Sequence, residues 1–375
     1  MNKQHNTPIP LFKVFMSKTI MKPLKQVLLS GYIGQGPQVE QLEKELSSFL
    51  GVPWLMTVNS GTSALSLALR LAGVGHNDEV ISTPMTCSAT NWPILAAGAR
   101  IVWADIDPQT GNIDPGCIKK LITSRTKAIM CVDWGGYPSD IDALKKVAGN
   151  IPIIEDAAHA LGALYKGRMV GQSADYTCFS LQAIKHLTAG DGGILVVSNK
   201  KDYKRGKLLR WYGIDRESRS QYDRIELDVA EWGYKYHMND INATIARGNL
   251  KHLSDILSKH RRNAAYYRKR LVDLKRVALT AENPDYTSSY WLFTILVDDV
   301  RRFMKYMSVR HIMTSQVHRR NDTHSVVSEF KRKLPGVDAF TKQMVCIPVG
   351  WWLTAKERKY IVDAIKAYDS SRPRT

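Results

Sequence analysis

Apolar runs alternate with helix-length segments between about residue 54 and residue 200. Five apolar runs are typical of buried strands: Trp54–Val58, Glu79–Ser82, Arg100–Ala104, Ala128–Asp133 and Ile151–Ile154. The segments between them have the length and pattern of helices: Thr62–Leu71, Ala89–Ala97, Pro115–Thr123 and Asp140–Val147. This alternation predicts βαβ units and a mainly parallel sheet with helices on both faces. Two more neighbouring strands are expected at Tyr176–Ser180 and Gly193–Val197.

The pattern changes after residue 200. Helices are predicted over Lys201–Tyr212, Asn239–Leu271 (broken near Lys259), Val300–Val309 and Thr354–Tyr368, and a strand over Ser289–Val297. We therefore expect an α/β fold in two parts. Residues 1–250 would form a three-layer α/β/α large domain with an N-terminal arm, and residues 251–375 a smaller α+β domain joined by the long helices.

The composition is that of an ordinary globular protein. Its 375 residues, 44% of them hydrophobic, suffice for one large domain and a smaller one. The best candidate for a membrane span, Trp92 to Trp103, is short and contains Arg100. Met1 to Pro8 is polar, unlike a signal peptide, so we expect a cytoplasmic protein without membrane association. The five scattered cysteines lack CxxC spacing and predict neither a disulfide framework nor a metal site.

The net charge of +18 is the strongest compositional bias. Basic clusters lie at Lys201–Arg210, Lys259–Arg270, Arg301–Arg320 and Lys331–Lys333. Such an excess favours anionic partners, including nucleic acid, a membrane surface or a phosphorylated small molecule. For most of these residues a solvated basic surface is the preferred explanation. No nucleic-acid-binding signature accompanies the charge, so a nucleic-acid partner is not expected.

The segment Asn59–Leu65 follows the first strand and opens a helix. Gly61 would let the backbone approach a ligand closely. Thr62 and Ser63 would place hydroxyls and backbone N–H groups at a helix N-terminus, where the helix dipole favours an anion. The alternative is an ordinary helix cap, for which hydroxyl residues are common.

Acids stand at the end of a predicted buried strand in Ile153–His159. Ligands of open α/β sheets bind at that edge. A carboxylate there can pair with a protonated ring nitrogen of a ligand, or it can cap the next turn. Both interpretations stay open on these residues alone.

The most informative stretch is Phe179–Gly193. A strand end is followed by Lys185 in a short polar turn, and then by a glycine-rich return to the next strand. A lysine desolvated in such a site can become a nucleophile. Ser180, at the strand end, could contact the phosphate of the same ligand.

Five motifs in this order resemble the DegT/DnrJ/EryC1/StrS nucleotide-sugar aminotransferases, which are fold-type I pyridoxal-phosphate enzymes. They are Ser30–Gly36, Ser60–Leu65, Glu155–Ala158, Phe179–Gly193 and Gly233–Ala243. The resemblance extends over roughly residues 10 to 365. It implies a pyridoxal 5'-phosphate cofactor held by Lys185 as a Schiff base. It also implies that Asp156 keeps the pyridine nitrogen protonated, and that His159 contacts the side of the ring that carries the hydroxyl.

The resemblance also assigns phosphate contacts. Thr62, Ser63 and Ser180 match the positions that bind the cofactor phosphate. Lys235 matches an asparagine that in many relatives reaches the phosphate from the partner subunit. The resemblance therefore implies a homodimer with shared active sites.

Two positions depart from the family pattern. Cys87 stands where relatives have an aromatic residue stacked on the cofactor ring. Either Trp92, Trp134 or another aromatic residue takes that place, or the packing on the ring is looser. Lys235 and His237 replace the usual asparagine and arginine. Lysine can still bind phosphate as a point charge.

The implied reaction transfers an amino group from an amino acid, with glutamate expected, to a nucleotide-linked keto-6-deoxyhexose, for amino-sugar or polysaccharide biosynthesis. Tyr32, His318 and Asn321 lie where relatives have substrate-facing residues. For His318 and Asn321, a basic surface turn is an alternative. The nucleotide and the position of the ketone, C3 or C4, are not readable from the sequence.

Two other functions are compatible with the fold. Pyridoxamine-dependent sugar dehydratases of this family carry histidine in place of the Schiff-base lysine. Here Lys185 occupies that position and His186 only follows it, which argues against a dehydratase. A non-catalytic, basic binding or regulatory protein would have no reason to keep Lys185, Asp156 and Ser180 together.

Overall fold

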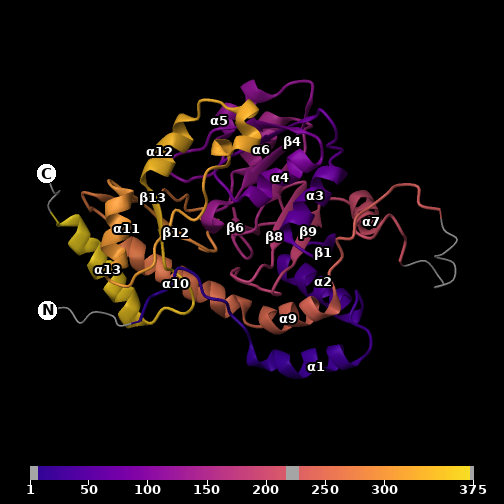
Figure 1. The fold of residues 1–375 in the computed structure, drawn as a ribbon, viewed down its shortest axis with the longest axis horizontal. Coiled ribbons are helices and arrows are strands. Elements are labelled where there is room, and N and C mark those ends of the chain that lie inside the picture. The colour runs from indigo at the N-terminus through magenta and orange to yellow at the C-terminus, as the bar shows by residue number, and fades with distance from the viewer. Residues whose placement is uncertain (1–6, 217–227, 372–375) are drawn as a thin grey trace.

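The computed structural model describes residues 7–216 and 228–371 (Figure 1). Its centre is a seven-stranded sheet in the order β1-β9-β8-β5-β4-β2-β3. The strands are β1 (Leu55–Val58), β2 (Glu79–Ser82), β3 (Arg100–Trp103), β4 (Thr126–Val132), β5 (Ile153–Asp156), β8 (Tyr176–Ser180) and β9 (Gly193–Val197). The strands from β8 to β3 pair in parallel, and β9 runs antiparallel between β8 and β1. The predicted mainly parallel sheet is confirmed.

Alternate residues of the central strands face two different cores. Ile154 and Met130 pack with helices α3 and α4, whereas Ile153 and Ile129 pack with α6. Side chains alternate between faces in a strand, so a continuous apolar run covers both sides of the sheet. The helices are α3 (Gly61–Leu71), α4 (Ser88–Ala96) and α6 (Ile141–Ala148). The same alternation places Asp156 at the α3 and α4 face and Glu155 at the other.

Three further helices cover the β8 and β9 part of the sheet or extend from it. They are α1 (Met21–Leu29), α2 (Pro37–Leu50) and α9 (Asp240–Leu250). α2 and α9 share a core with Phe179 and Val196. Asp240 joins two of the sequence motifs, because its carboxylate accepts hydrogen bonds from the backbone N–H groups of Gly36 and Val39, at 2.9 and 3.1 Å. The glycine-rich segment before α2 is thereby tied to the start of α9.

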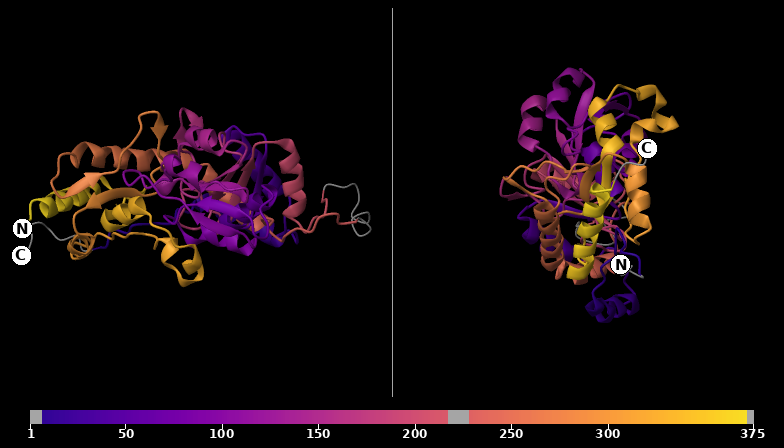
Figure 2. Two further views of the ribbon diagram at one scale, coloured as in Figure 1. Left: turned by 90° about the horizontal axis from the view of Figure 1, so that it is seen from above. Right: turned by 90° about the vertical axis from the view of Figure 1, so that its left-hand side faces the viewer.

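A second sheet, in the order β10-β12-β13, lies in the C-terminal part of the chain. It is composed of β10 (Val277–Leu279), β12 (Phe293–Val297) and β13 (Met344–Ile347), with α10 (Leu253–Arg270), α11 (Val300–Ser308), α12 (Pro335–Gln343) and α13 (Ala355–Asp369). Figure 2 shows α11 and α13 at one end of the molecule and α7 (Lys200–Leu209) at the other. Ile9 exchanges backbone hydrogen bonds with His311 and Met313, so the N-terminal arm packs on this smaller core. The predicted division at residue 250 stays a prediction.

Three details of the predicted elements were wrong or missing. The break in the long helical segment lies at Lys251–His252, not near Lys259. α10 continues through Lys259 because that residue is on its polar side and pairs with Asp255, while Ile256 and His260 face the core. The strand expected from Ser289 begins only at Phe293. No prediction covered α1, α2, α12 or β13.

The described residues show how some of the basic side chains are paired and whether a helix could span a membrane. Several arginines of the basic clusters are paired, including Arg205 with Glu231 and Arg210 with Glu43. Among the helices of residues 7–216 and 228–371, none is long and apolar enough to cross a bilayer. The cytoplasmic location stays a prediction.

Candidate active site

Most of the predicted cofactor residues meet at one edge of the large sheet. In the strand register Gly193 lies between Val58 and Ser180, so the turn after β1 lies against the end of β8. A Cβ atom on Gly61 would stand only 3.0 Å from the Cβ of Ser180. Glycine is therefore what permits this close approach. The edge is the one at which parallel α/β sheets bind ligands.

The N-terminus of α3 forms a polar surface beside Ser180. The Ser60 hydroxyl caps the helix by accepting from the backbone N–H of Ser63 at 3.0 Å, and the Ser63 hydroxyl donates to Asn59 Oδ1 at 2.6 Å. Ser63 is buried, Ser180 is partly buried and Thr62 is exposed. Helix dipole, backbone N–H groups and hydroxyls together suit a phosphate. The predicted phosphate contacts are thus close in space, and their role stays a prediction.

Asp156 ends β5 and is buried. Its Oδ2 accepts a 2.6 Å hydrogen bond from the Thr90 hydroxyl, and its Oδ1 accepts one of 3.1 Å from the backbone N–H of Ala158. Burial raises the pKa of this carboxyl group, while Thr90, Ala158 and the charge of Lys185 act to lower it. Each oxygen has a further lone pair. The group can therefore accept a proton-bearing ring nitrogen in addition.

Lys185 lies in the turn after β8, partly buried. Desolvation lowers the pKa of its ammonium group to about 7, against the opposing influence of Asp156 and Cys87. A substantial fraction of the amine is therefore neutral near pH 7, which is the nucleophilic form. The Nζ atom lies 3.6 Å from the ring centroid of Trp291.

Two histidines near Lys185 have buried nitrogens that need partners. The His159 Nδ1 and His318 Nε2 atoms have no hydrogen-bond partner among the residues that the structure describes. The two rings are nearly parallel, with centroids 6.0 Å apart. Burial, with the charge of Lys185, lowers the pKa of both, that of His318 to about 4. Neutral imidazoles with unsatisfied nitrogens suit a bound polar ring, so the site fits a pyridine cofactor.

Trp291 is the aromatic residue beside Lys185, and the sequence analysis did not identify it. Its ring stacks on His159 with centroids 3.9 Å apart and on Phe12 at 4.9 Å. Its Nε1 donates to the Ile184 carbonyl at 2.9 Å. The other aromatic candidates lie differently: Trp134 meets His159 edge-on at 6.4 Å and Trp92 lies against His324. Which ring covers the cofactor stays untested.

Three other predicted residues lie apart from this cluster or have their polar atoms hydrogen-bonded to other residues of the chain. Tyr32 is 54% exposed, and its hydroxyl donates to the Gln35 carbonyl. Lys235 is exposed, and its backbone carbonyl accepts from Asn59 Nδ2 of the same chain at 3.2 Å. Asn321 is buried, with its side-chain amide bonded to Asn91 and to backbone carbonyls. The contacts of Asn321 favour a role in holding the loop, and its substrate role stays a prediction.

A large cavity of the described residues does not contain the lysine. It has a volume of about 1170 Å³ and lies between the start of the chain and α7. Its lining includes Tyr32, Lys204, Lys207, Arg216 and Glu40, but neither Lys185 nor Asp156. A large cavity volume therefore does not by itself mark the site of the chemistry, and the cluster of titratable groups around Lys185 is the better guide.

The low pKa of Lys185 makes a prediction for the apo protein. The rate at which pyridoxal phosphate attaches should rise with pH up to about 7 and then level off, because only the neutral amine attacks and its fraction grows as pH rises through the pKa. Rapid mixing with absorbance detection measures it, with Nα-acetyl-lysine as the reference amine. A rate that still rises steeply above pH 9 would show that the pKa of Lys185 is that of an ordinary lysine.

The chain places a lysine of lowered pKa and a buried carboxylate at the carboxyl edge of a mainly parallel sheet. Fold-type I transferases use pyridoxal phosphate with this pair of groups. Residues 15–366 match the DegT/DnrJ/EryC1/StrS aminotransferase family, and the chain belongs to that family. It is therefore a pyridoxal-phosphate-dependent sugar aminotransferase.

Solved relatives are similar over nearly the whole chain. AtS13 from Actinomadura melliaura is 43% identical, with a TM-score of 0.94 over 97% of this chain and 100% of that one. The sugar aminotransferase CalS13 from Micromonospora echinospora is 40% identical, with a TM-score of 0.92 over 96% and 99%. The spore coat polysaccharide biosynthesis protein SpsC of Bacillus subtilis is 34% identical over 80% of this chain and 78% of its own.

Proposed function

We propose that this aminotransferase takes an amino group from glutamate and delivers it to the keto carbon of a nucleotide-linked 6-deoxyhexose. The product would serve amino-sugar or polysaccharide biosynthesis. The observation that carries the proposal is the juxtaposition of Lys185, Asp156 and Ser180 at one sheet edge in a chain 40% identical to a sugar aminotransferase.

Each polar residue of the edge has a role in this reaction. Bound pyridoxal phosphate supplies an electron sink for the carbon that loses and gains a proton. Lys185, neutral in part near pH 7, carries that proton between substrate and cofactor carbons. Asp156 would hold the proton of the ring nitrogen, and His159, in the turn after β5, would contact the ring. The α3 N-terminus and Ser180 would hold the phosphate.

The intact lysine disfavours the two alternatives. A sugar dehydratase of this family would carry histidine at position 185, and the chain has Lys185 there. A non-catalytic protein would gain little from burying both Asp156 and Lys185, since removing charged groups from water costs free energy even when they are hydrogen-bonded. A yellow purified protein would argue against the non-catalytic function at once.

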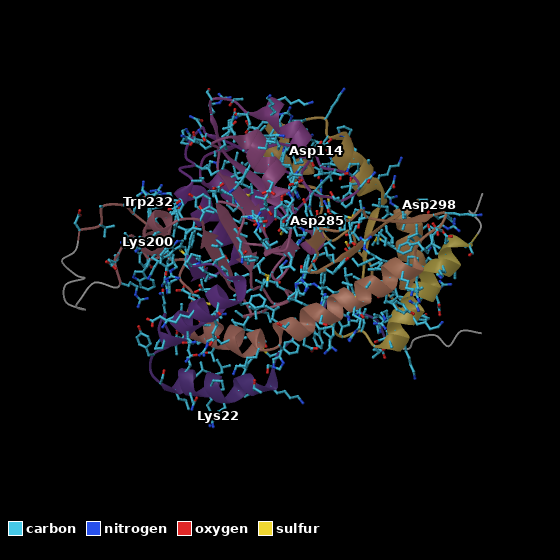
Figure 3. All side chains as sticks on the ribbon, turned by 180° about the vertical axis from the view of Figure 1, so that it is seen from behind. Lys22, Asp114, Lys200, Trp232, Asp285 and Asp298 are labelled. Atoms are coloured by element: carbon cyan, nitrogen blue, oxygen red, sulfur yellow. The ribbon has the colours of Figure 1, made fainter. Side chains whose placement is uncertain are left out.

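The surface near the large cavity is consistent with a homodimer. α1 contributes Pro23 and Val27 to the cavity lining and exposes further apolar side chains, with Leu29 74% exposed; Trp232, outside the lining, is 59% exposed. Figure 3 places Lys200 and Trp232 together near α7, and Lys22 on the outlying α1. Exposed apolar groups at one end of a monomer are typical of surfaces that a second subunit covers. This supports a dimer whose interface includes the cavity and Tyr32.

The partner role of Lys235 can be tested by mixing two defective chains, of which Lys185→Ala lacks the Schiff-base lysine and Lys235→Ala should retain the cofactor less well. If Lys235 serves the partner's phosphate, a mixed dimer of Lys185→Ala and Lys235→Ala chains has one site with both defects and one with neither. Part of the activity should then return after subunit exchange. The backbone contact between Lys235 and Asn59 of its own chain makes a contact in cis the alternative. In that case each site keeps one defect, and exchanged mixtures show no more activity than the mean of their parents.

The substrate assignment calls for a screen. Purified protein would be incubated with glutamate and nucleotide-linked keto sugars bearing the ketone at C3 or C4, on GDP, UDP or dTDP. Mass spectrometry should detect the amino sugar together with 2-oxoglutarate. Loss of water from the sugar without glutamate consumption would instead identify a dehydratase.

A further inference from the structure

Two threonine hydroxyls form a chain of hydrogen bonds that ends at the Asp156 carboxylate. The Thr90 hydroxyl donates to Asp156 Oδ2 at 2.6 Å, and the hydroxyls of Thr86 and Thr90 lie 2.6 Å apart. Both threonines are 1% exposed. Thr90 stands in the first turn of α4, on the sheet face that Asp156 shares, and Thr86 precedes that helix.

The direction of this chain of hydrogen bonds follows from counting protons. A hydroxyl has one proton, and an ionised carboxylate only accepts. Because Thr90 gives its proton to Asp156, the bond between the threonines must run from Thr86 to Thr90. In this direction the hydrogen bonds are donated toward Asp156, which favours its ionised state, the one that pairs with a protonated ring nitrogen.

The loop that carries Thr86 is itself held from the C-terminal part of the chain. Asn321 Nδ2 donates to the Thr86 carbonyl at 2.9 Å, and Asn321 Oδ1 accepts from Asn91 Nδ2 at 2.8 Å. The backbone N–H of Asn321 donates to the Pro84 carbonyl at 2.9 Å. All of these groups are buried, so water does not compete for the bonds.

We propose that Thr90 is a positioning residue for the transamination, and that Thr86 and Thr90 form a hydroxyl relay that keeps Asp156 ionised and aimed at the ring nitrogen of the cofactor. The inference rests on the proposed role of Asp156. Rotation of a carboxylate about its last bond is soft, so a hydrogen bond on each oxygen is needed to fix its plane. Thr90 holds one oxygen and the Ala158 N–H the other.

Thr90→Val and Thr90→Ser separate the hydroxyl from the shape of the side chain. Hydrogen bonds to charged groups are the stronger ones, so Thr90→Val should weaken pyridoxal-phosphate affinity by about tenfold. The ring nitrogen should lose its proton about one pH unit lower, as followed by the ¹⁵N resonance of ring-labelled cofactor in the holoenzyme. Thr90→Ser should restore both values. Thr244→Val is the matched control, since that buried hydroxyl bonds only the Asp240 carbonyl among the residues described.

Asp156→Asn in the same titration distinguishes a failure of the relay from a failure of the proposed role of Asp156. If Asp156→Asn moves the nitrogen titration and Thr90→Val does not, the relay is overturned and the role of Asp156 stands. If neither moves it, the role of Asp156 itself fails. Should Thr90→Val not fold, Thr86→Val replaces it, with a smaller shift in the same direction expected. A shift equal to that of Thr244→Val would overturn the relay.

Discussion

Lys185→Ala is expected to lower the transamination rate by at least about a thousandfold. The substitution removes the amine that attaches the cofactor and the group that moves the proton, and positioned proton transfer alone contributes about 10²–10⁴-fold. Pyridoxamine phosphate should still bind, because Ser180, Asp156 and the α3 N-terminus are untouched. Single-turnover kinetics with pyridoxamine phosphate and a keto sugar would measure the loss.

The matched control is Lys120→Ala, which removes an exposed lysine from the turn after α5 (Pro115–Ile118). It should leave the rate unchanged. A Lys185→Ala protein that turns over within tenfold of the parent would mean that another amine carries out the chemistry.

Asp156→Asn should have the second largest effect. The amide cannot hold the proton of the ring nitrogen, so the carbanionic state next to the ring loses stabilisation. Removal of one preorganised electrostatic contact costs about 2.7–4 kcal/mol, or about a hundred- to thousandfold in rate. Thermal unfolding of the apo protein should change little by comparison, since the asparagine Oδ1 can still accept from the Ala158 N–H while its Nδ2 donates to a rotated Thr90 hydroxyl.

Glu155→Gln is the natural comparison for that variant. Glu155 is also buried, but on the opposite sheet face, where Thr177 donates to it at 2.8 Å. Burial raises the pKa of its carboxyl group to about 7. Glutamine there should leave the rate close to that of the parent. If instead Glu155→Gln is the inactive variant and Asp156→Asn turns over normally, the acid that holds the ring is Glu155.

Much of the large sheet could be predicted because its signal is local. Runs such as Ile151–Ile154 are apolar on both faces, and in the segments between them the apolar residues recur with the period of a helix. Ser180 followed from the same logic, since it ends a predicted strand, and the acids Glu155 and Asp156 follow the strand predicted at Ile151–Ile154. The choice of Asp156 between them came from the resemblance to the family. Lys185 followed from its polar turn and from the resemblance to the family.

What could not be predicted depends on contacts between distant segments. Trp291 contacts Lys185 from the segment before β12, where the Ser289 N–H donates to the Gly136 carbonyl far away in the sequence. Thr90 meets Asp156 across the space between α4 and β5. No periodicity in the sequence records such pairs. The helix break at Lys251 was missed for a similar reason, since neighbouring Asn249 bonds Thr188 and Ser17 there.

Borohydride reduction of the holoenzyme, followed by peptide mapping, tests the central claim most directly. Reduction should fix the cofactor to the protein, and the modified peptide should carry it on Lys185. The Lys185→Ala protein, loaded in parallel, should yield no adduct. A cofactor-loaded parent protein that gives an adduct on a different lysine, or none at all, would contradict the assignment.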